Sequence, residues 1–96
     1  MATYMIFLRE GEIFNPEEMA TYSTMTRTTL GNFKLKPLVI YGNLETMEGE
    51  APDGVVMLEF PTVEDAKTWY FSPGYQAAAE HRKKGANYRV FMIEGV

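Results

Sequence analysis

Apolar residues gather into four short runs and two longer helical stretches along the chain. The four runs have the lengths and the β-branched or aromatic content typical of strands, and they span residues 3–9, 38–41, 55–60 and 88–94. The first helical stretch has an apolar side formed by Met19, Tyr22, Thr26 and Leu30. A second helical stretch follows the third run. The pattern therefore predicts the element order β-α-β-β-α-β.

Capping residues mark the predicted helix starts. Asn15 and Ser72 each precede a proline, and Thr62 is followed three residues later by Asp65, as in a capping box. Since the cap at Ser72 falls within the second helical stretch, we expect that stretch to break there into two segments. Residues 42–54 are harder to interpret, because the weak alternation over residues 44–50 would extend a hairpin formed by the second and third strands.

This order predicts a ferredoxin-like α+β fold in one domain, residues 1–96. Right-handed crossovers then give a four-stranded antiparallel sheet in the order 4-1-3-2, with the helices on one face. The first and last strands are apolar on both faces in their middles, so the other face needs a cover too. A homodimer in which a second copy packs sheet to sheet would supply it.

Composition narrows the function classes. The net charge of -4 argues against a nucleic-acid partner, which requires clustered Lys and Arg. The chain has no cysteine and one histidine, so we expect no disulfide and no metal site. No apolar run approaches the ~20 residues that span a membrane, and no secretion signal is apparent at the N-terminus. We therefore expect a cytoplasmic protein without a membrane partner.

Two residues are candidates for acid–base chemistry, His81 and Tyr75. His81 lies about 100° around its helix from the apolar side, near the helix end whose dipole favours a charged imidazole. A histidine at such a boundary is also commonly structural. The basic run at residues 82–84 is expected to interact with the same helix dipole, although residue 82 shares the apolar side with Tyr75.

Further candidates would bind a ligand between helices and sheet. They are Tyr22, Trp69 and Tyr70, whose rings either fill the core or line a small-molecule site, and Arg9 and Arg89. Because Arg9 ends the first strand and Arg89 begins the last, antiparallel pairing would bring both to one end of the sheet, near His81. Which face each arginine occupies is open, and exposed ion pairs are the alternative to a ligand site.

Residues 58–76, LEFPTVEDAKTWYFSPGYQ, resemble the signature of the family catalogued as domain of unknown function 1330. The closing strand, from Arg89 to Gly95, resembles that family too, whereas residues 31–42 lack its Gly-Gly and Arg-Gly-Gly elements. The resemblance implies a dimeric α+β barrel, a superfamily that includes small monooxygenases and muconolactone isomerases. It implies no particular reaction.

We therefore expect a protein that binds a small molecule and uses no cofactor. The leading hypothesis allows it to be a cofactor-free enzyme acting on a small aromatic or polyketide-like compound, with His81 or a tyrosine as acid or base and an arginine stabilising negative charge. The alternative is a non-catalytic dimeric binding or interaction module. A cavity beside Tyr75 and His81 would favour the first hypothesis, and solid packing there would favour the second.

Overall fold

The structure is a computed structural model that describes residues 1–96. Its elements, in chain order, are β1 (Thr3–Glu10), α1 (Pro16–Leu30), β2 (Lys36–Ile40), β3 (Gly54–Phe60), α2 (Val63–Tyr70), α3 (Pro73–Lys83) and β4 (Asn87–Glu94). The helices α2 and α3 are the two segments of the second predicted helical stretch. The expected β-α-β-β-α-β order and the break at Ser72 are confirmed.

All four strands form one antiparallel sheet in the order β2-β3-β1-β4, which confirms the predicted order 4-1-3-2. The strand β1 is central and pairs with both β3 and β4. The strand β2 lies at an edge, and its register shifts between Pro37 and Val39. An edge position suits Pro37, because proline cannot donate to a second neighbouring strand.

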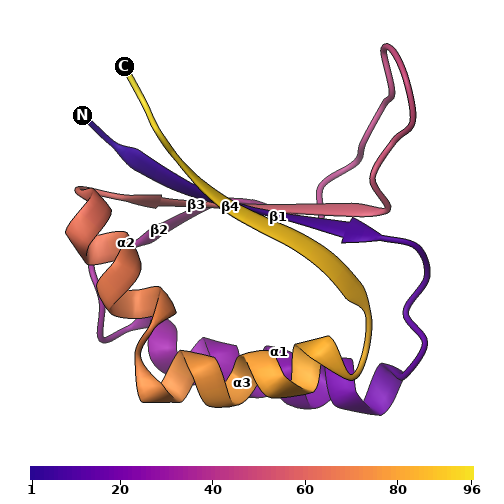
Figure 1. The fold of residues 1–96 in the computed structure, drawn as a ribbon, viewed down its shortest axis with the longest axis horizontal. Helices are drawn as coiled ribbons and strands as arrows, with labels where there is room; N and C mark the ends of the chain where they lie inside the picture. Colours follow the sequence, from indigo (N-terminus) through magenta and orange to yellow (C-terminus); the bar gives the residue numbers. More distant parts are fainter.

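The helices cover one face of the sheet, and α1 and α3 lie beside each other (Figure 1). Residues 41–53 rise from the sheet on the opposite side, as do both chain termini (Figure 1). The weak alternation over residues 44–50 does not form a strand, so that expectation was wrong. This loop contains three glutamates and a glycine with φ 75, Gly49, which together oppose a regular extended ribbon.

Each predicted cap binds the backbone of its own helix. The side chain of Asn15 accepts a hydrogen bond from the Glu18 amide at 3.3 Å, and that of Thr62 accepts from the Asp65 amide at 3.1 Å. Ser72 accepts from the amide three residues further on, also at 3.3 Å, and its hydroxyl donates to the last turn of α2 at 2.7 Å. These bonds satisfy amide groups that a helix start leaves unpaired.

The buried core lies between the sheet and the helices. Its eight members are Met5, Phe7, Leu58, Phe60, Ala66, Trp69, Tyr75 and Ala79. The outer face of the sheet, which points away from the helices, is also apolar and includes Ile6, Leu8, Met57, Phe91 and Ile93. The side chain of Phe91 is 41% exposed there, whereas Phe7 is only 2% exposed and faces the helices. The sheet therefore has an apolar face that this chain alone leaves open.

Candidate functional site

A cavity of about 530 Å³ lies between α1 and the sheet, and we refer to it as the α1 cavity. Its seventeen lining residues are Phe7, Arg9, Ile13, Pro16, Met19, Ala20, Tyr22, Ser23, Thr26, Arg27, Leu30, Ile40, Tyr41, Val56, Leu58, Trp69 and Tyr88. Twelve of them are hydrophobic. This volume and this mostly apolar lining are typical of sites for small organic molecules.

The roof of the α1 cavity is one side of α1. Lining residues recur along this helix at intervals of three or four, from Pro16 to Leu30, as residues on one helix side must. Only Thr29 of the fifteen residues in α1 is buried. The predicted apolar side of α1, which includes Met19 and Tyr22, is therefore half-buried over a cavity instead of packed into the core.

The floor of the cavity is the helix-facing side of the sheet. Phe7 and Arg9 of β1 lie there, and their cross-strand partners Val56 of β3 and Tyr88 of β4 lie there too. Residues directly opposite each other in an antiparallel sheet share a face, which explains why these side chains converge. Because Arg9 and Tyr88 stand at the end of β1 and the start of β4, the polar part of the floor is at this end of the sheet.

Two pairs of tyrosine hydroxyls adjoin the α1 cavity. The hydroxyl oxygens of Tyr22 and Tyr75 lie 2.9 Å apart, and those of Tyr41 and Tyr88 lie 2.5 Å apart. Tyr75 is fully buried, and its ring centre lies 4.1 Å from that of Trp69. Tyr75 therefore reaches the cavity only through Tyr22, which lines it.

Burial raises the pKa of three of these tyrosines above the ordinary value of 10.0, at which a tyrosine is already neutral at physiological pH. It raises the pKa of Tyr22 above its ordinary value, and the hydrogen bond with Tyr75 and the charge of Arg82 offset only part of this. Burial also raises the pKa of Tyr75, and the neighbouring Tyr22 raises it further. For Tyr41, burial and the hydrogen bond with Tyr88 raise the pKa in the same direction. All three hydroxyls are therefore neutral at physiological pH and can donate hydrogen bonds.

Arg82 is the functional candidate that sequence reasoning missed. Its side chain is 4% exposed, and its guanidinium lies 5.5–6.0 Å from the centres of three aromatic rings, those of Phe7, Tyr22 and Tyr88. The basic run at residues 82–84 was expected to interact with the dipole at the end of its helix, and of its three residues only Lys83 and Lys84 are exposed. The available signal was spacing, because residue 82 falls on the same side of α3 as Tyr75.

Arg9, a ligand-binding candidate whose face the sequence left open, lines the α1 cavity. Its guanidinium donates to the backbone carbonyl of Asp53 at 2.8 Å and lies 5.9 Å from the centre of the Tyr41 ring. Gly54, which pairs with Arg9 across the sheet, leaves room for that ring. A Cβ atom at Gly54 would come within 2.9 Å of two Tyr41 ring carbons.

His81 and Arg89 lie away from the α1 cavity. His81 Nδ1 is 2.5 Å from Glu18 Oε2, so this side chain bridges α3 and α1. Arg89 pairs with Leu8 across the sheet and therefore occupies the outer face, where its Nε donates to Glu10 at 2.6 Å. The sequence correctly brought Arg9 and Arg89 to one end of the sheet, but they occupy opposite faces. The expected meeting of Arg9, His81 and Arg89 at one ligand site does not occur.

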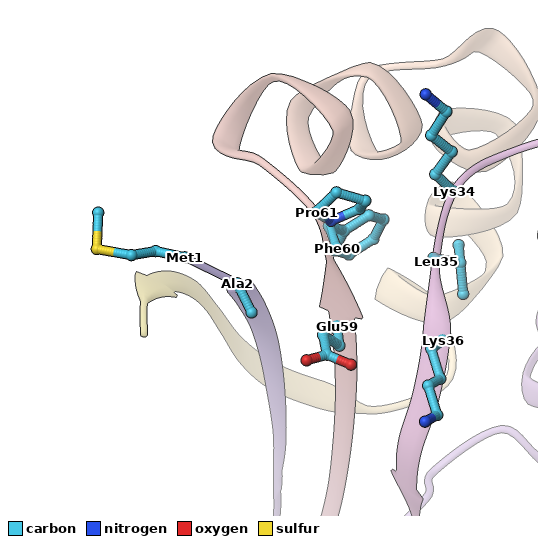
Figure 2. Close-up of a pocket in the computed structure, with 8 residues that line it drawn as sticks. All are labelled: Met1, Ala2, Lys34, Leu35, Lys36, Glu59, Phe60 and Pro61. Carbon is cyan, nitrogen blue, oxygen red and sulfur yellow. The ribbon is translucent and has the colours of Figure 1, made fainter. Parts of the chain in front are cut away.

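Two further hollows lie outside the α1 cavity. One, of about 450 Å³, is lined by Tyr70, Arg82 and the start of β4, so the predicted ligand residue Tyr70 borders this space and not the α1 cavity. The other, of about 430 Å³, lies at the far end of the sheet (Figure 2). Figure 2 shows Glu59 of β3 between Ala2 and Lys36 of the neighbouring segments. Because Glu59 and Lys36 are exposed or half-exposed on the outer face, this hollow is a shallow surface feature.

The structure contains neither a cluster of metal ligands nor a helix that could span a membrane. No three His, Cys, Asp or Glu residues lie close enough together to hold a metal ion. None of the helices has the length and apolar character needed to cross a membrane. The α1 cavity, with its arginine and tyrosine neighbours, is therefore the best candidate for a binding or catalytic site.

Comparisons with known proteins agree with this fold. A family model described as a domain of unknown function (DUF1330) matches residues 2–96. No protein of curated function matches the sequence. A protein of unknown function from Rhodopseudomonas palustris, with 20% identity, has a similar structure, with a TM-score of 0.75 over 99% of this chain and 82% of that chain.

Two further solved structures are similar over nearly the whole chain. A dimeric ferredoxin-like protein of unknown function from Thermobifida fusca has 14% identity and a TM-score of 0.67, over 97% of this chain and 90% of that chain. A mutant of a cofactor-independent oxygenase from Streptomyces nogalater has 6% identity and a TM-score of 0.63, over 98% and 91%. At these identities the similarity establishes the ferredoxin-like fold alone.

Proposed function

The chain belongs to the DUF1330 family, and we propose that it binds a small, flat, largely apolar molecule in the α1 cavity. The observation that carries this proposal is the half-buried inner side of α1, where a fifteen-residue helix contributes one buried residue to the fold. An amphipathic helix ordinarily buries its apolar side against the core. Here the apolar side faces about 530 Å³ of open space, which a bound molecule would fill.

A neutral fluorescent probe tests this proposal. Phenylnaphthylamine is flat and apolar, and its emission rises when it leaves water for an apolar site. We expect the wild-type protein to bind it, because burial of its apolar surface drives association. Ser23→Phe, which adds a ring to the cavity lining, should weaken binding by about tenfold or more, which corresponds to about 1.4 kcal/mol.

The matched control is Thr24→Phe, at the next position of the same helix. Thr24 is exposed and does not line the cavity, so this variant should keep the wild-type affinity. Both variants add the same side chain to α1, and a difference between them reports on the cavity alone. Equal affinities in all three proteins, or no binding to the wild type, would show that the cavity is not a ligand site.

We propose further that the protein acts as a homodimer in which the outer faces of two sheets pack together. The apolar side chains on that face, such as Ile6 and Phe91, favour a cover, and a second copy of the chain is the simplest one. The Thermobifida fusca neighbour is described as dimeric. The α1 cavity lies on the other side of the sheet, so dimerisation would leave it open.

A cofactor-free reaction is the second candidate function, favoured by the Tyr22–Tyr75 pair. If the Tyr75 hydroxyl donates to Tyr22, the proton of Tyr22 is free to form a hydrogen bond to a ketone oxygen in the cavity. With the positive charge of Arg82 5.9 Å from the Tyr22 ring, negative charge that develops on an enolate oxygen would be stabilised while water removes the α-proton. The Streptomyces nogalater neighbour, a cofactor-independent oxygenase, shares the fold.

Hydrogen–deuterium exchange distinguishes this reaction from simple binding. With β-tetralone in deuterated buffer, proton NMR follows the loss of the α-hydrogens. A catalyst should accelerate exchange in the wild type, and Tyr22→Phe should abolish the acceleration. If exchange is no faster than in buffer while phenylnaphthylamine binds, the non-catalytic binding module is the correct description.

A further inference from the structure

One guanidinium group, that of Arg9, lines the α1 cavity, and a second, that of Arg82, lies behind the aromatic part of its wall. Nε of Arg9 and Nε of Arg82 are both shielded from solvent and have no hydrogen-bond partner. Arg9 lines the cavity directly. Arg82 lies against the rings of Phe7, Tyr22 and Tyr88, all of which line it. A molecule in the cavity can therefore contact Arg9, whereas Arg82 acts on it through its positive charge from behind these three rings.

The positive charges of these groups are uncompensated as well. The ion pairs of the molecule are His81–Glu18, Lys83–Glu80 and Arg89–Glu10, and neither Arg9 nor Arg82 belongs to one. The carboxylate of Asp53 accepts a hydrogen bond from the Gly11 amide at 2.6 Å, whereas Arg9 donates to the neutral backbone carbonyl of Asp53. No acidic residue lines the cavity.

Burying a guanidinium without a counter-ion costs free energy, and aromatic rings offset only part of it. A chain with a net charge of -4 has acidic side chains available, yet it places none here. The cavity is therefore a positive site in an acidic protein, and it would attract negatively charged molecules.

We infer that the molecule bound in the α1 cavity is an organic anion: an apolar ring system that carries an ionised oxygen group, with the charged end held by Arg9 and favoured by the nearby positive charge of Arg82. This inference rests on the proposed binding function and adds the chemical class of the ligand. The apolar part would lie toward Leu58 and Trp69. The anionic oxygens would accept hydrogen bonds from the guanidinium group of Arg9, because charge-assisted bonds of this kind are stronger than those between neutral groups.

A pair of probes with one skeleton tests the inference. Anilinonaphthalene sulfonate carries the same two ring systems as phenylnaphthylamine and adds an ionised oxygen group. We expect the wild type to bind the sulfonate about tenfold or more tightly than the neutral probe. Arg9→Met, which removes the charge and keeps an unbranched apolar side chain, should reduce the ratio of the two affinities to about one.

Lys67→Gln is the charge-matched control. Lys67 is an exposed residue of α2 that does not line the cavity, so its loss of one positive charge should change neither affinity. Arg82→Met provides a second variant, and it should lower the sulfonate preference by a smaller factor, because Arg82 acts from behind the Tyr22 ring. Ser23→Phe should weaken both probes together, which identifies the α1 cavity as the place where they bind.

The possible failures separate the two proposals. If the neutral probe does not bind the wild type, the proposed function is wrong. If the neutral probe binds but the sulfonate binds no more tightly, or if Arg82→Met and Arg9→Met both keep the sulfonate preference, the inference of an anionic ligand is wrong while the binding function stands.

Discussion

The hydroxyl oxygens of Tyr22 and Tyr75 lie 2.9 Å apart and link α1 to α3, although 53 residues separate them in the chain. Changing either tyrosine to phenylalanine should leave the other hydroxyl without its partner, at a cost of about 1–3 kcal/mol in the free energy of unfolding. The double variant removes both hydroxyls and should cost less than the sum of the single changes. Urea denaturation of the four proteins measures this, and additive effects would mean that the bond contributes nothing.

Stability should decrease in alkaline solution. Burial raises the pKa of both Tyr22 and Tyr75 above the ordinary value of 10.0, so the folded state holds these protons more tightly than the unfolded chain does. The free energy of unfolding is therefore unaffected by these groups below pH 10 and decreases as the pH rises above it. Tyr75→Phe removes one such group and should make the decrease shallower, by up to about 1.4 kcal/mol per pH unit. Denaturation between pH 9 and about 11 measures the slope, and an identical slope in both proteins would contradict this assignment.

Gly54→Ala should destabilise the protein by about 1–3 kcal/mol, because the added Cβ overlaps the ring of Tyr41 at 2.9 Å. The same change should cost little in a Tyr41→Ala background, where the ring is absent. Thermal unfolding of the single and double variants tests this coupling. Since Tyr41 lines the α1 cavity, Gly54→Ala alone should also alter the affinity for phenylnaphthylamine.

Asp substitutions at Phe91 and Phe7 should have different effects. Light scattering of the wild type should give about twice 10.9 kDa. Phe91→Asp places a charge on the outer face and should yield a folded monomer, whereas Phe7→Asp places one in the core and should unfold the chain. Circular dichroism distinguishes a folded monomer from an unfolded one. A monomeric wild type at high micromolar concentration would remove the proposed dimer.

His81→Ala tests the histidine that the sequence nominated for catalysis. Because His81 and Glu18 are 2.5 Å apart between α3 and α1, we expect its loss to lower stability by less than about 1 kcal/mol, as for other partly exposed pairs. Binding of phenylnaphthylamine should stay at wild-type affinity. A loss of binding or of β-tetralone exchange with unchanged stability would instead support the catalytic role first expected for His81.

The fold was predictable from the sequence because its signals are local. The caps at Asn15, Thr62 and Ser72 each act within one helical turn, and the apolar runs have the lengths of strands. These signals, with the handedness of crossovers, determine the sheet order. The loop at residues 41–53 has only a weak alternation over residues 44–50, which suggested a strand that does not form, so its course could not be deduced.

The candidate site was only partly predictable, for two physical reasons. Arg9 pairs with Tyr88 and Arg89 pairs with Leu8, so the two arginines are offset by one residue and occupy opposite faces of the sheet. The sequence does not specify this register, and a shift of one residue would move every side chain of a strand to the other face. His81 and Arg82 are neighbours on α3. The histidine was expected at the ligand site and lies away from the α1 cavity, whereas the arginine was expected at the helix end and is buried. The helical spacing put Arg82 on the same side of α3 as the buried Tyr75. Because arginine is rarely buried, its charge nevertheless suggested an exposed residue.

The single buried residue of α1 also bears on how such proteins could diverge. Of the eight α1 side chains that line the cavity, only Tyr22 and Leu30 pack against the core, so most substitutions among the other six should be tolerated by the fold. Changes at Ala20, Ser23 or Thr26 could therefore alter which molecule fits while the sheet, α2 and α3 stay intact. Residues of α1 would then determine which ligand binds, while the rest of the fold stays the same. A library randomised at these positions should yield folded proteins with different binding preferences.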